Sequence, residues 1–333
     1  MPETVTSLST LLHPVLPADF LADSFDQAPL HIRGEPGKFA SVMSWEVLNR
    51  LLAMDVWTGQ TLQLYADTRQ VPPAAYCERT VNRNRQQVMQ PDAEKVMALI
   101  RRGASLLLNE VESLHAGTLA VAQALQEGLG AKSAANIYCS WQRHQAFDSH
   151  YDRHDVFVLQ ISGAKAWRIY EGRTDNPIEH TAFYKVPQAE YDRLKGLVAS
   201  ELEMRPGDLL YLPRGQFHDA LASSAASLHV TFCCTRPTGL DLLTRLWEQA
   251  VGDSLFRAYL PQQEEALQAR VAELMTRLNL MADDDEGRAR TMALQESFRI
   301  KRPAFDLPNR GTREPSPDGD EDQPVVHRLM TGS

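Results

Sequence analysis

Apolar residues in the first part of the chain follow two different patterns. Where they recur at intervals of three and four residues they predict helices, and where they form short runs they predict strands. Helical spacing is found over 19–25, 44–54, 92–103 and 116–129. Short strands are expected over 29–32, 61–67 and 105–110. This region therefore mixes helix and strand.

From about residue 135 the pattern changes to short apolar runs separated by turn sequences such as Ser-Gly and Arg-Pro-Gly. The runs lie at 135–141, 155–161, 165–170, 208–213 and 227–234. Several short strands in succession favour a sandwich or barrel of the jelly-roll kind. We therefore expect a mainly β fold with added α-helices.

Beyond Pro237 the strand pattern stops. Helical spacing returns over 240–251, 264–281 and 286–298. The last stretch is rich in Pro, Gly and charged residues, which is typical of a disordered tail. The expected organisation is a β-rich domain with an N-terminal α/β elaboration over 1–237, a helical region over 238–308 and a tail over 309–333.

Composition and charge narrow the class of protein. The chain has 333 residues, of which 43% are hydrophobic and 23% charged, as in ordinary soluble domains. No apolar run reaches the roughly 20 residues that cross a bilayer, and the N-terminal residues do not resemble a secretory signal. A net charge of −9 argues against direct binding to nucleic acid, which needs a basic face. The four cysteines have no metal-type spacing, so we expect free thiols and a cytoplasmic location.

His150 and Asp152 form a His-x-Asp sequence just before the predicted strand 155–161. In an extended chain alternate side chains point to the same face, so this imidazole and this carboxylate can converge on one point. Two histidines and one carboxylate, with positions left open, are the ligand set of non-haem Fe(II) oxygenases. A His-x-Asp pair alone is common on protein surfaces, so the prediction depends on a third ligand.

His218 is the candidate third ligand. It follows the predicted strand that ends at Pro213, and Gly215 lies in the turn between them. Glycine adopts backbone conformations that other residues resist, so this turn can return His218 to the side of the other two ligands.

A second turn, at Ser162-Gly163, predicts a hairpin that sets 165–170 antiparallel to 155–161. Lys165 opens the second of these strands. A buried lysine is costly unless it is paired with an anion, so Lys165 is either a solvated strand residue or part of a site for an anionic ligand.

These segments resemble a known family. Residues 207–218 match Gly-x5-Pro-x-Gly-x2-His, which is similar to the second cupin signature, although Ala222 stands where asparagine is usual. Residues 149–170 resemble the JmjC-containing ribosomal oxygenases of bacteria and their human relatives, the cupin-like protein hydroxylases. The matching residues after the His-x-Asp pair are Asp155, Phe157, Leu159, Gln160, Gly163, Lys165, Trp167 and Arg168.

The resemblance implies a double-stranded β-helix of the cupin and JmjC type and a 2-oxoglutarate-dependent dioxygenase. It implies Fe(II) held by His150, Asp152 and His218, with 2-oxoglutarate and O2 as co-substrates. In the family, the residue at the position of Lys165 binds the far carboxylate of 2-oxoglutarate. Further candidates for contacts with 2-oxoglutarate are Tyr138, Ser140 and Asn136, and candidates for substrate contacts or for support of the ligands are His229, His154 and Ser227.

The family also suggests partners. It implies hydroxylation of a protein side chain, with a ribosomal protein as the leading candidate, and an acidic chain suits a basic partner. Family members carry dimerisation helices and a winged-helix region after the barrel, so the region 238–308 is expected to provide one or both, and a homodimer is expected. Two alternatives stay open, a small-molecule or peptide-tailoring oxygenase and a non-catalytic metal-binding cupin scaffold. Hydroxylation and demethylation are both compatible with the sequence.

Overall fold

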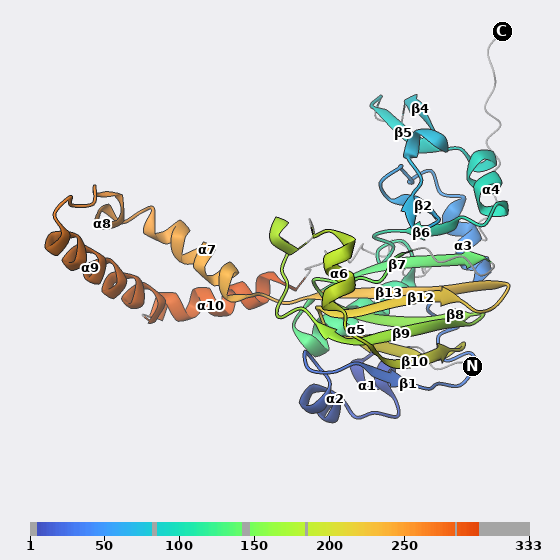
Figure 1. The fold of residues 1–333 in the computed structure, drawn as a ribbon, viewed down its shortest axis with the longest axis horizontal. Coiled ribbons are helices and arrows are strands. Elements are labelled where there is room, and N and C mark those ends of the chain that lie inside the picture. The colour runs from blue at the N-terminus through green and yellow to red at the C-terminus, as the bar shows by residue number, and fades with distance from the viewer. Residues whose placement is uncertain (1–4, 82–84, 142–146, 184–185, 284, 300–333) are drawn as a thin grey trace, which may run out of the picture. The chain divides into compact units, whose positions relative to one another are not determined.

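The computed structural model describes residues 5–81, 85–141, 147–183, 186–283 and 285–299. Two antiparallel sheets form its centre (Figure 1). The larger sheet has the strand order β1-β11-β8-β13-β7-β6-β2-β3, and the smaller has the order β10-β9-β12. This arrangement confirms the expected mainly β jelly roll.

The strands of the larger sheet are β1 (Leu30–Ile32), β2 (Leu62–Ala66), β3 (Arg69–Gln70), β6 (Ser105–Leu108), β7 (Lys132–Trp141), β8 (Asp155–Ser162), β11 (Leu209–Leu212) and β13 (Ala226–Thr235). The smaller sheet contains β9 (Lys165–Arg173), β10 (Val198–Met204) and β12 (Gln216–Ala222). A separate hairpin is formed by β4 (Cys77–Val81) and β5 (Gln87–Pro91).

One face of the larger sheet packs against N-terminal helices. Leu106, Ile137 and Phe157 on this face belong to the same buried apolar cluster as Leu11 and Leu125 of the helices. The helices before and within the jelly roll are α1 (Leu8–Leu12), α2 (Pro17–Asp23), α3 (Trp45–Leu52), α4 (Ala93–Arg101), α5 (Ala116–Leu129) and α6 (Gln188–Leu194), with short 3-10 turns at Pro73–Ala75 and Thr181–Phe183. The flanking N-terminal helices are thus present as expected.

The other face of the larger sheet faces the smaller sheet. Val158 and Leu210 from the larger sheet pack there against Trp167 and Ile169 from the smaller sheet. This second, smaller cluster closes part of the space between the sheets. The rest of that space carries the polar side chains described below.

The expected hairpin between 155–161 and 165–170 is wrong. Strand β8 pairs with β11 and β13 in the larger sheet, whereas β9 pairs with β10 and β12 in the smaller one. The turn at Ser162-Gly163 therefore carries the chain from one sheet to the facing sheet. Gly163 has φ +67°, and a Cβ there would lie 1.8 Å from the carbonyl oxygen of Ala226, so this crossing requires glycine.

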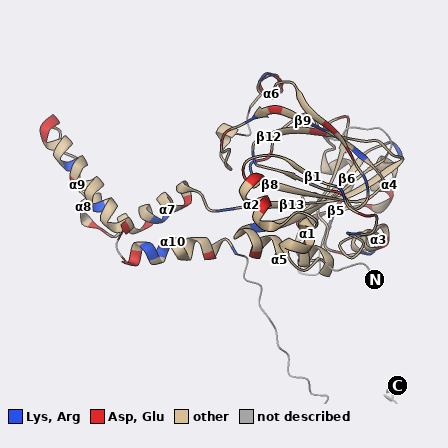
Figure 2. Ribbon diagram, turned by 90° about the horizontal axis from the view of Figure 1, so that it is seen from below, with Lys and Arg blue, Asp and Glu red and all other residues tan. Residues whose placement is uncertain are grey.

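The segment after the jelly roll is helical, as expected. It contains α7 (Gly239–Ala250), α8 (Ser254–Arg257), α9 (Glu264–Asp283) and α10 (Asp285–Ser297), and α7, α9 and α10 contact one another. Thr238 and Asp241 form a capping box at the start of α7, which satisfies backbone N–H groups of its first turn. Acidic and basic side chains alternate along α9 and α10 (Figure 2).

Some expectations lie beyond what the structure tests. The predicted tail 309–333 and residues 300–308 of the predicted helical region lie outside the described residues. A role of this region in dimerisation or as a winged helix stays a prediction. Among the helices in the described ranges, none has the length and apolar character needed to cross a membrane.

Candidate metal centre

His150, Asp152 and His218 come together at the edge of the smaller sheet. His218 lies on β12, and His150 forms an antiparallel bridge with it through backbone hydrogen bonds of 3.1 and 2.8 Å. Asp152 follows two residues later on the same face, and its Oδ2 lies 3.6 Å from His218 Nε2. One ligand atom from each of the three residues lies within 4.8 Å of the others. The bridge explains the convergence, because it fixes the two histidines opposite each other.

In each histidine of this group the Nδ1 atom forms a hydrogen bond to a backbone carbonyl oxygen. His150 Nδ1 donates to the carbonyl oxygen of Asp148 at 2.8 Å, and His218 Nδ1 donates to that of Gln216 at 2.9 Å. These bonds leave Nε2 of each ring as the lone-pair donor and hold the ring orientation, as is usual for metal-bound histidines. Burial and the neighbouring His150 lower the pKa of His218 to about 4, so this imidazole is neutral near pH 7.

The chemistry of the three donors fits a divalent transition metal. Two imidazoles and a carboxylate form a facial set that leaves other coordination positions free for further ligands. Burial opposes ionisation of Asp152, but its electrostatic interactions with the surrounding basic groups, His154 first among them, outweigh burial and lower the pKa of this carboxyl. A carboxylate is thus present to ligate a cation.

Lys165 is buried and has no anionic partner among the described residues. It opens β9 and is 5% exposed. Burial lowers the pKa of Lys165 to about 8, and in the described part of the chain the opposing influence comes from the Cys139 thiol and from no carboxylate. A buried ammonium group is stabilised by a paired anion, so this position suits an anionic ligand better than an empty interior.

Two more polar groups, near both Lys165 and the three candidate metal ligands, have no hydrogen-bond partner among the described residues. His229 Nδ1 and Trp167 Nε1 are buried without a hydrogen bond to any described residue. The ring of Trp167 lies 5.8 Å from that of His218 and 6.0 Å from that of His229. Lys165 Nζ lies 5.8 Å from the centre of the Trp167 ring. Buried polar atoms are nearly always satisfied, so this cluster is suited to a polar ligand between Lys165 and the three candidate metal ligands.

The remaining predicted contacts of 2-oxoglutarate lie on β7. Tyr138 stacks on His229 with ring centres 4.9 Å apart and planes 2° apart. Ser140 is buried and accepts a hydrogen bond from Ser105 at 3.2 Å. Asn136 lies farther along β7, where its Nδ2 contacts Cys233 Sγ at 3.8 Å. All three are on the face of the larger sheet that faces the smaller sheet, and Tyr138 lies nearest to the buried cluster.

The three residues with less specific predictions lie in different surroundings. His229 is buried, and burial together with Lys165 lowers its pKa, so its ring is neutral. Ser227 is buried and accepts a hydrogen bond from Gln160 Nε2 at 2.9 Å. His154 is half-buried beside Asp152 and Cys233. His229 therefore lies within the cluster, Ser227 beyond it and His154 at its outer side.

Sequence reasoning missed Trp167 as a site residue. It stands two positions after Lys165 on β9, and alternate strand residues share a face, so the argument that joined His150 to Asp152 also applies here. It missed Gln160 as well, whose side chain spans to Ser162, Gly163 and Ser227 and holds the turn beside Lys165.

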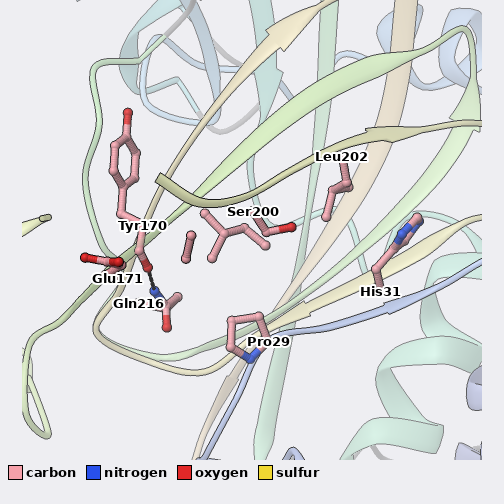
Figure 3. Close-up of a pocket in the computed structure, with 9 residues that line it drawn as sticks. Pro29, His31, Tyr170, Glu171, Ser200, Leu202 and Gln216 are labelled. Carbon is pink, nitrogen blue, oxygen red and sulfur yellow. Dashed lines mark hydrogen bonds between the residues drawn. The ribbon is translucent and has the colours of Figure 1, made fainter. Parts of the chain in front are cut away.

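A separate hollow lies at the opposite edge of the jelly roll. It has a volume of about 380 Å³ and includes His31, Ser200 and Leu202 in its lining (Figure 3). Gln216 also borders it and donates from Nε2 to the carbonyl oxygen of Tyr170 at 2.7 Å. None of the three candidate metal ligands lines this hollow, so it is distinct from the candidate centre.

The chain matches the model of the JmjC domain over residues 113–242. It is 31% identical over 225 residues to ribosomal oxygenase 1 of Gallus gallus, which covers 66% of this chain and 35% of that protein. Residues 113–242 therefore form a JmjC domain, and the chain is similar to the ribosomal oxygenases. The expected JmjC type of double-stranded β-helix is thereby confirmed.

Two further proteins are similar to this chain, one in sequence and one in fold. The chain is 28% identical over 264 residues to the bifunctional lysine-specific demethylase and histidyl-hydroxylase NO66 of Drosophila persimilis, covering 75% of this chain and 34% of that protein. The structure of the ribosomal oxygenase YcfD from Escherichia coli has a TM-score of 0.56 at 17% identity, over 84% of this chain and 69% of that one. It supports the fold alone. This JmjC chain spans about a third of the length of these two curated relatives.

Proposed function

We propose that this JmjC chain is an Fe(II)- and 2-oxoglutarate-dependent oxygenase that hydroxylates a side chain of a protein. The observation that carries the proposal is the pairing of a His-Asp-His ligand set with a buried lysine on the same side of the smaller sheet, a lysine that has no carboxylate partner in the described part of the chain. A metal site alone would need no such lysine, and a dicarboxylate co-substrate would use both features. A solved structure of YcfD in complex with cobalt and 2-oxoglutarate has the same fold, with a TM-score of 0.53.

In this proposal the metal ligands and Lys165 lie at two ends of the same face of the smaller sheet, and the larger sheet lines the space opposite them. His150, Asp152 and His218 hold Fe(II), which with bound 2-oxoglutarate and O2 supplies oxidative decarboxylation to succinate and CO2 and places one oxygen atom in a substrate C–H bond. Lys165 binds the far carboxylate, and Tyr138 borders the space between the two ends. The protein supplies orientation and a dry pocket, because the residues around Lys165 are buried.

Supporting roles are proposed for the other predicted residues. The neutral ring of His229 can donate a hydrogen bond to a carboxylate or accept one from a hydroxyl, and its stacking on Tyr138 keeps both rings fixed. Ser140 and Ser227 are cross-strand neighbours on β7 and β13 and support the pocket from the larger sheet. Asn136 and His154 lie toward the outside, where contacts with a substrate are more suitable than contacts with 2-oxoglutarate.

A ribosomal protein is the proposed substrate. The name of ribosomal oxygenase 1 refers to the ribosome, and that of NO66 refers to hydroxylation of a histidyl residue. The net charge of −9 favours association with a basic protein. The proposal includes a cytoplasmic location. It does not include direct binding to nucleic acid.

A second copy of the chain is the proposed partner of the helical region. Leu240, Leu243 and Trp247 recur at helical spacing on α7 and are 53%, 52% and 72% exposed. An apolar stripe of this kind on a helix is typical of a protein–protein interface. A homodimer formed through α7 would cover it.

The function can be tested by following succinate. Anaerobically purified protein is mixed with Fe(II) and 2-oxoglutarate, O2 is admitted, and the rate is measured with and without an acid extract of ribosomal proteins. We expect a rate that rises with the extract and falls more than about 100-fold in His218→Ala, which loses a metal ligand. The exposed His180→Ala is the matched control.

Each alternative has its own outcome. Succinate that depends on His218 but not on the extract would favour a small-molecule or peptide substrate. Release of formaldehyde, in place of a mass gain of one oxygen atom, would identify a demethylase. An absence of both succinate and 2-oxoglutarate binding would contradict the proposal and leave a metal-binding scaffold.

A further inference from the structure

The larger sheet is wider than the smaller sheet that faces it. Among the described residues, the smaller sheet ends with β12 and the single bridge at His150, next to β7. The larger sheet continues past β7 through β6, β2 and β3, which lie on the side away from β9 and β10 (Figure 1). We call this extension, residues 62–66, 69–70 and 105–108, the overhang.

The strand register shows which side chains of the overhang face the same way as the site. Leu107 pairs with Tyr138, and Gln63 pairs with Leu107, so all three lie on one face. Tyr65 pairs with Ser105, whose hydroxyl donates to Ser140 in the same buried region. The face that carries the candidate 2-oxoglutarate pocket therefore continues, without a covering strand in the described chain, into Gln63 and Tyr65, which are half-buried, with the buried Leu107 between them and Tyr138.

An aromatic contact joins the overhang to the candidate metal ligands. The Phe147 ring lies 4.5 Å from the Tyr65 ring and 5.9 Å from the His150 ring, measured between centres. Phe147 also meets Tyr138 edge-on at 6.1 Å. The hydroxyl of Tyr65 donates to Gln63 Oε1 at 3.0 Å, which fixes the tilt of its ring. A preformed aromatic wall thus leads from the overhang to His150.

Two other directions around the three candidate metal ligands are filled by side chains of the described residues. Toward β10, the space between the sheets is filled by an apolar cluster that includes Val156, Trp167, Ile169 and Leu212. The inner end is occupied by the proposed anion site at Lys165 and by Gln160, both buried. On the side of the overhang, neither of these groups stands between a large molecule and the metal ligands.

We infer that the overhang is the docking surface for the substrate, and that Tyr65 and Phe147 are positioning residues against which the substrate side chain packs. The inference rests on the proposed function and deepens it. Aromatic faces hold a side chain by contact area and ring geometry without a charge, so they fix its distance from the metal without binding the metal. Neither residue is itself a proposed metal ligand or 2-oxoglutarate contact, and Tyr65 reaches His150 only through Phe147, so we expect the effect of Tyr65 to be on the protein substrate.

The test compares Tyr65→Ala with Tyr65→Phe and with Tyr259→Ala, a tyrosine that is fully exposed. The probe is the ribosomal protein that the wild-type chain marks in an acid extract of ribosomes, identified by a mass gain of one oxygen atom. We expect Tyr65→Ala to raise the KM for this protein about tenfold, with little change in the KM for 2-oxoglutarate. Tyr65→Phe keeps the aromatic face and should stay within about twofold of the wild type.

The outcomes separate this inference from the proposal on which it rests. If the wild type marks a ribosomal protein and Tyr65→Ala has the same KM as Tyr259→Ala, the docking surface is wrong and the proposed function stands. A rise in both KM values together with a lower melting temperature would indicate a structural role of Tyr65 and would also overturn the inference. If the wild type marks no ribosomal protein, the substrate under the proposed function fails, and this inference fails with it.

Discussion

The two faces of the larger sheet bury side chains of opposite character. Toward the N-terminal helices the sheet presents Leu106, Ile137 and Phe157, which pack in one continuous apolar cluster. Toward the smaller sheet the same strands present Tyr138 and His229, and the polar atom His229 Nδ1 has no partner among the described residues. The first face can be explained by folding alone, because burial of apolar area is its own stabilisation. The second face cannot be explained in this way, because it buries polar atoms without hydrogen bonds to described residues. A polar ligand that supplies these hydrogen bonds would explain it.

The apolar face should give the largest loss of stability. Phe157 is fully buried, with ring centres 4.9 Å from Tyr211 and 5.8 Å from Phe20. We expect Phe157→Ala to lower the free energy of unfolding by about 3–5 kcal/mol, from lost transfer energy and the cavity left behind. Urea unfolding measures this change. Thr231→Val on the opposite face is the control, and a comparable loss there would contradict the contrast between the faces.

Lys165, on the strand β9 of the smaller sheet that lies opposite the polar face, should behave in the reverse way. Its pKa of about 8, against 10.5 for an ordinary lysine, corresponds at roughly 1.4 kcal/mol per pKa unit to about 3 kcal/mol of penalty for the buried charge near pH 7. Lys165→Met should therefore stabilise the ligand-free protein by up to about 3 kcal/mol, since methionine fills the same space without a charge. It should also weaken 2-oxoglutarate binding by at least about tenfold, because a charge-assisted contact is lost.

Calorimetric titration with 2-oxoglutarate and thermal unfolding of the same samples measure both effects. The distinctive result is a gain in stability together with a loss of 2-oxoglutarate binding in the same variant. If Lys165→Met lowered the melting temperature and left binding unchanged, Lys165 would be an ordinary core residue and the contrast between the two faces would lose its functional meaning.

These two faces also differ in how far the sequence predicts them. Alternation on a strand is a local property, so His150-x-Asp152 and the strand of Lys165 could be recognised directly, and Trp167 was within reach of the same argument. The partner of a strand is not a local property. A turn such as Ser162-Gly163 is compatible with a hairpin and with a crossing between facing sheets, and the sequence contains no signal that distinguishes them.

Other features depend on contacts that are distant along the chain. Strand β10 went unpredicted because five of its seven residues are exposed, and its apolar and polar residues do not alternate clearly enough to distinguish it from a loop. The position of Tyr65 on the same face as Tyr138 follows from the successive pairing of β2 with β6 and of β6 with β7, across more than 70 residues. Periodicity identifies such strands but does not predict their register.

The smallest expected effect is a pH dependence that belongs to the polar face alone. Because burial lowers the pKa of Lys165 to about 8, the ligand-free protein loses this charge as the pH rises through that value. Binding of a dicarboxylate then requires uptake of a proton, and the Kd for 2-oxoglutarate should rise about tenfold per pH unit above pH 8. The unfolded chain keeps this lysine charged up to about pH 10.5, so the free-energy penalty of burying the charge is complete below pH 8 and fades between pH 8 and 10.5.

Lys165→Arg retains a cation throughout this range, so its Kd should be flat where that of the wild type rises, whatever its absolute affinity. Titrations between about pH 6.5 and 9.5 compare the two slopes. Parallel slopes would mean that another group titrates with binding, and that the buried charge of Lys165 is not the partner of the ligand.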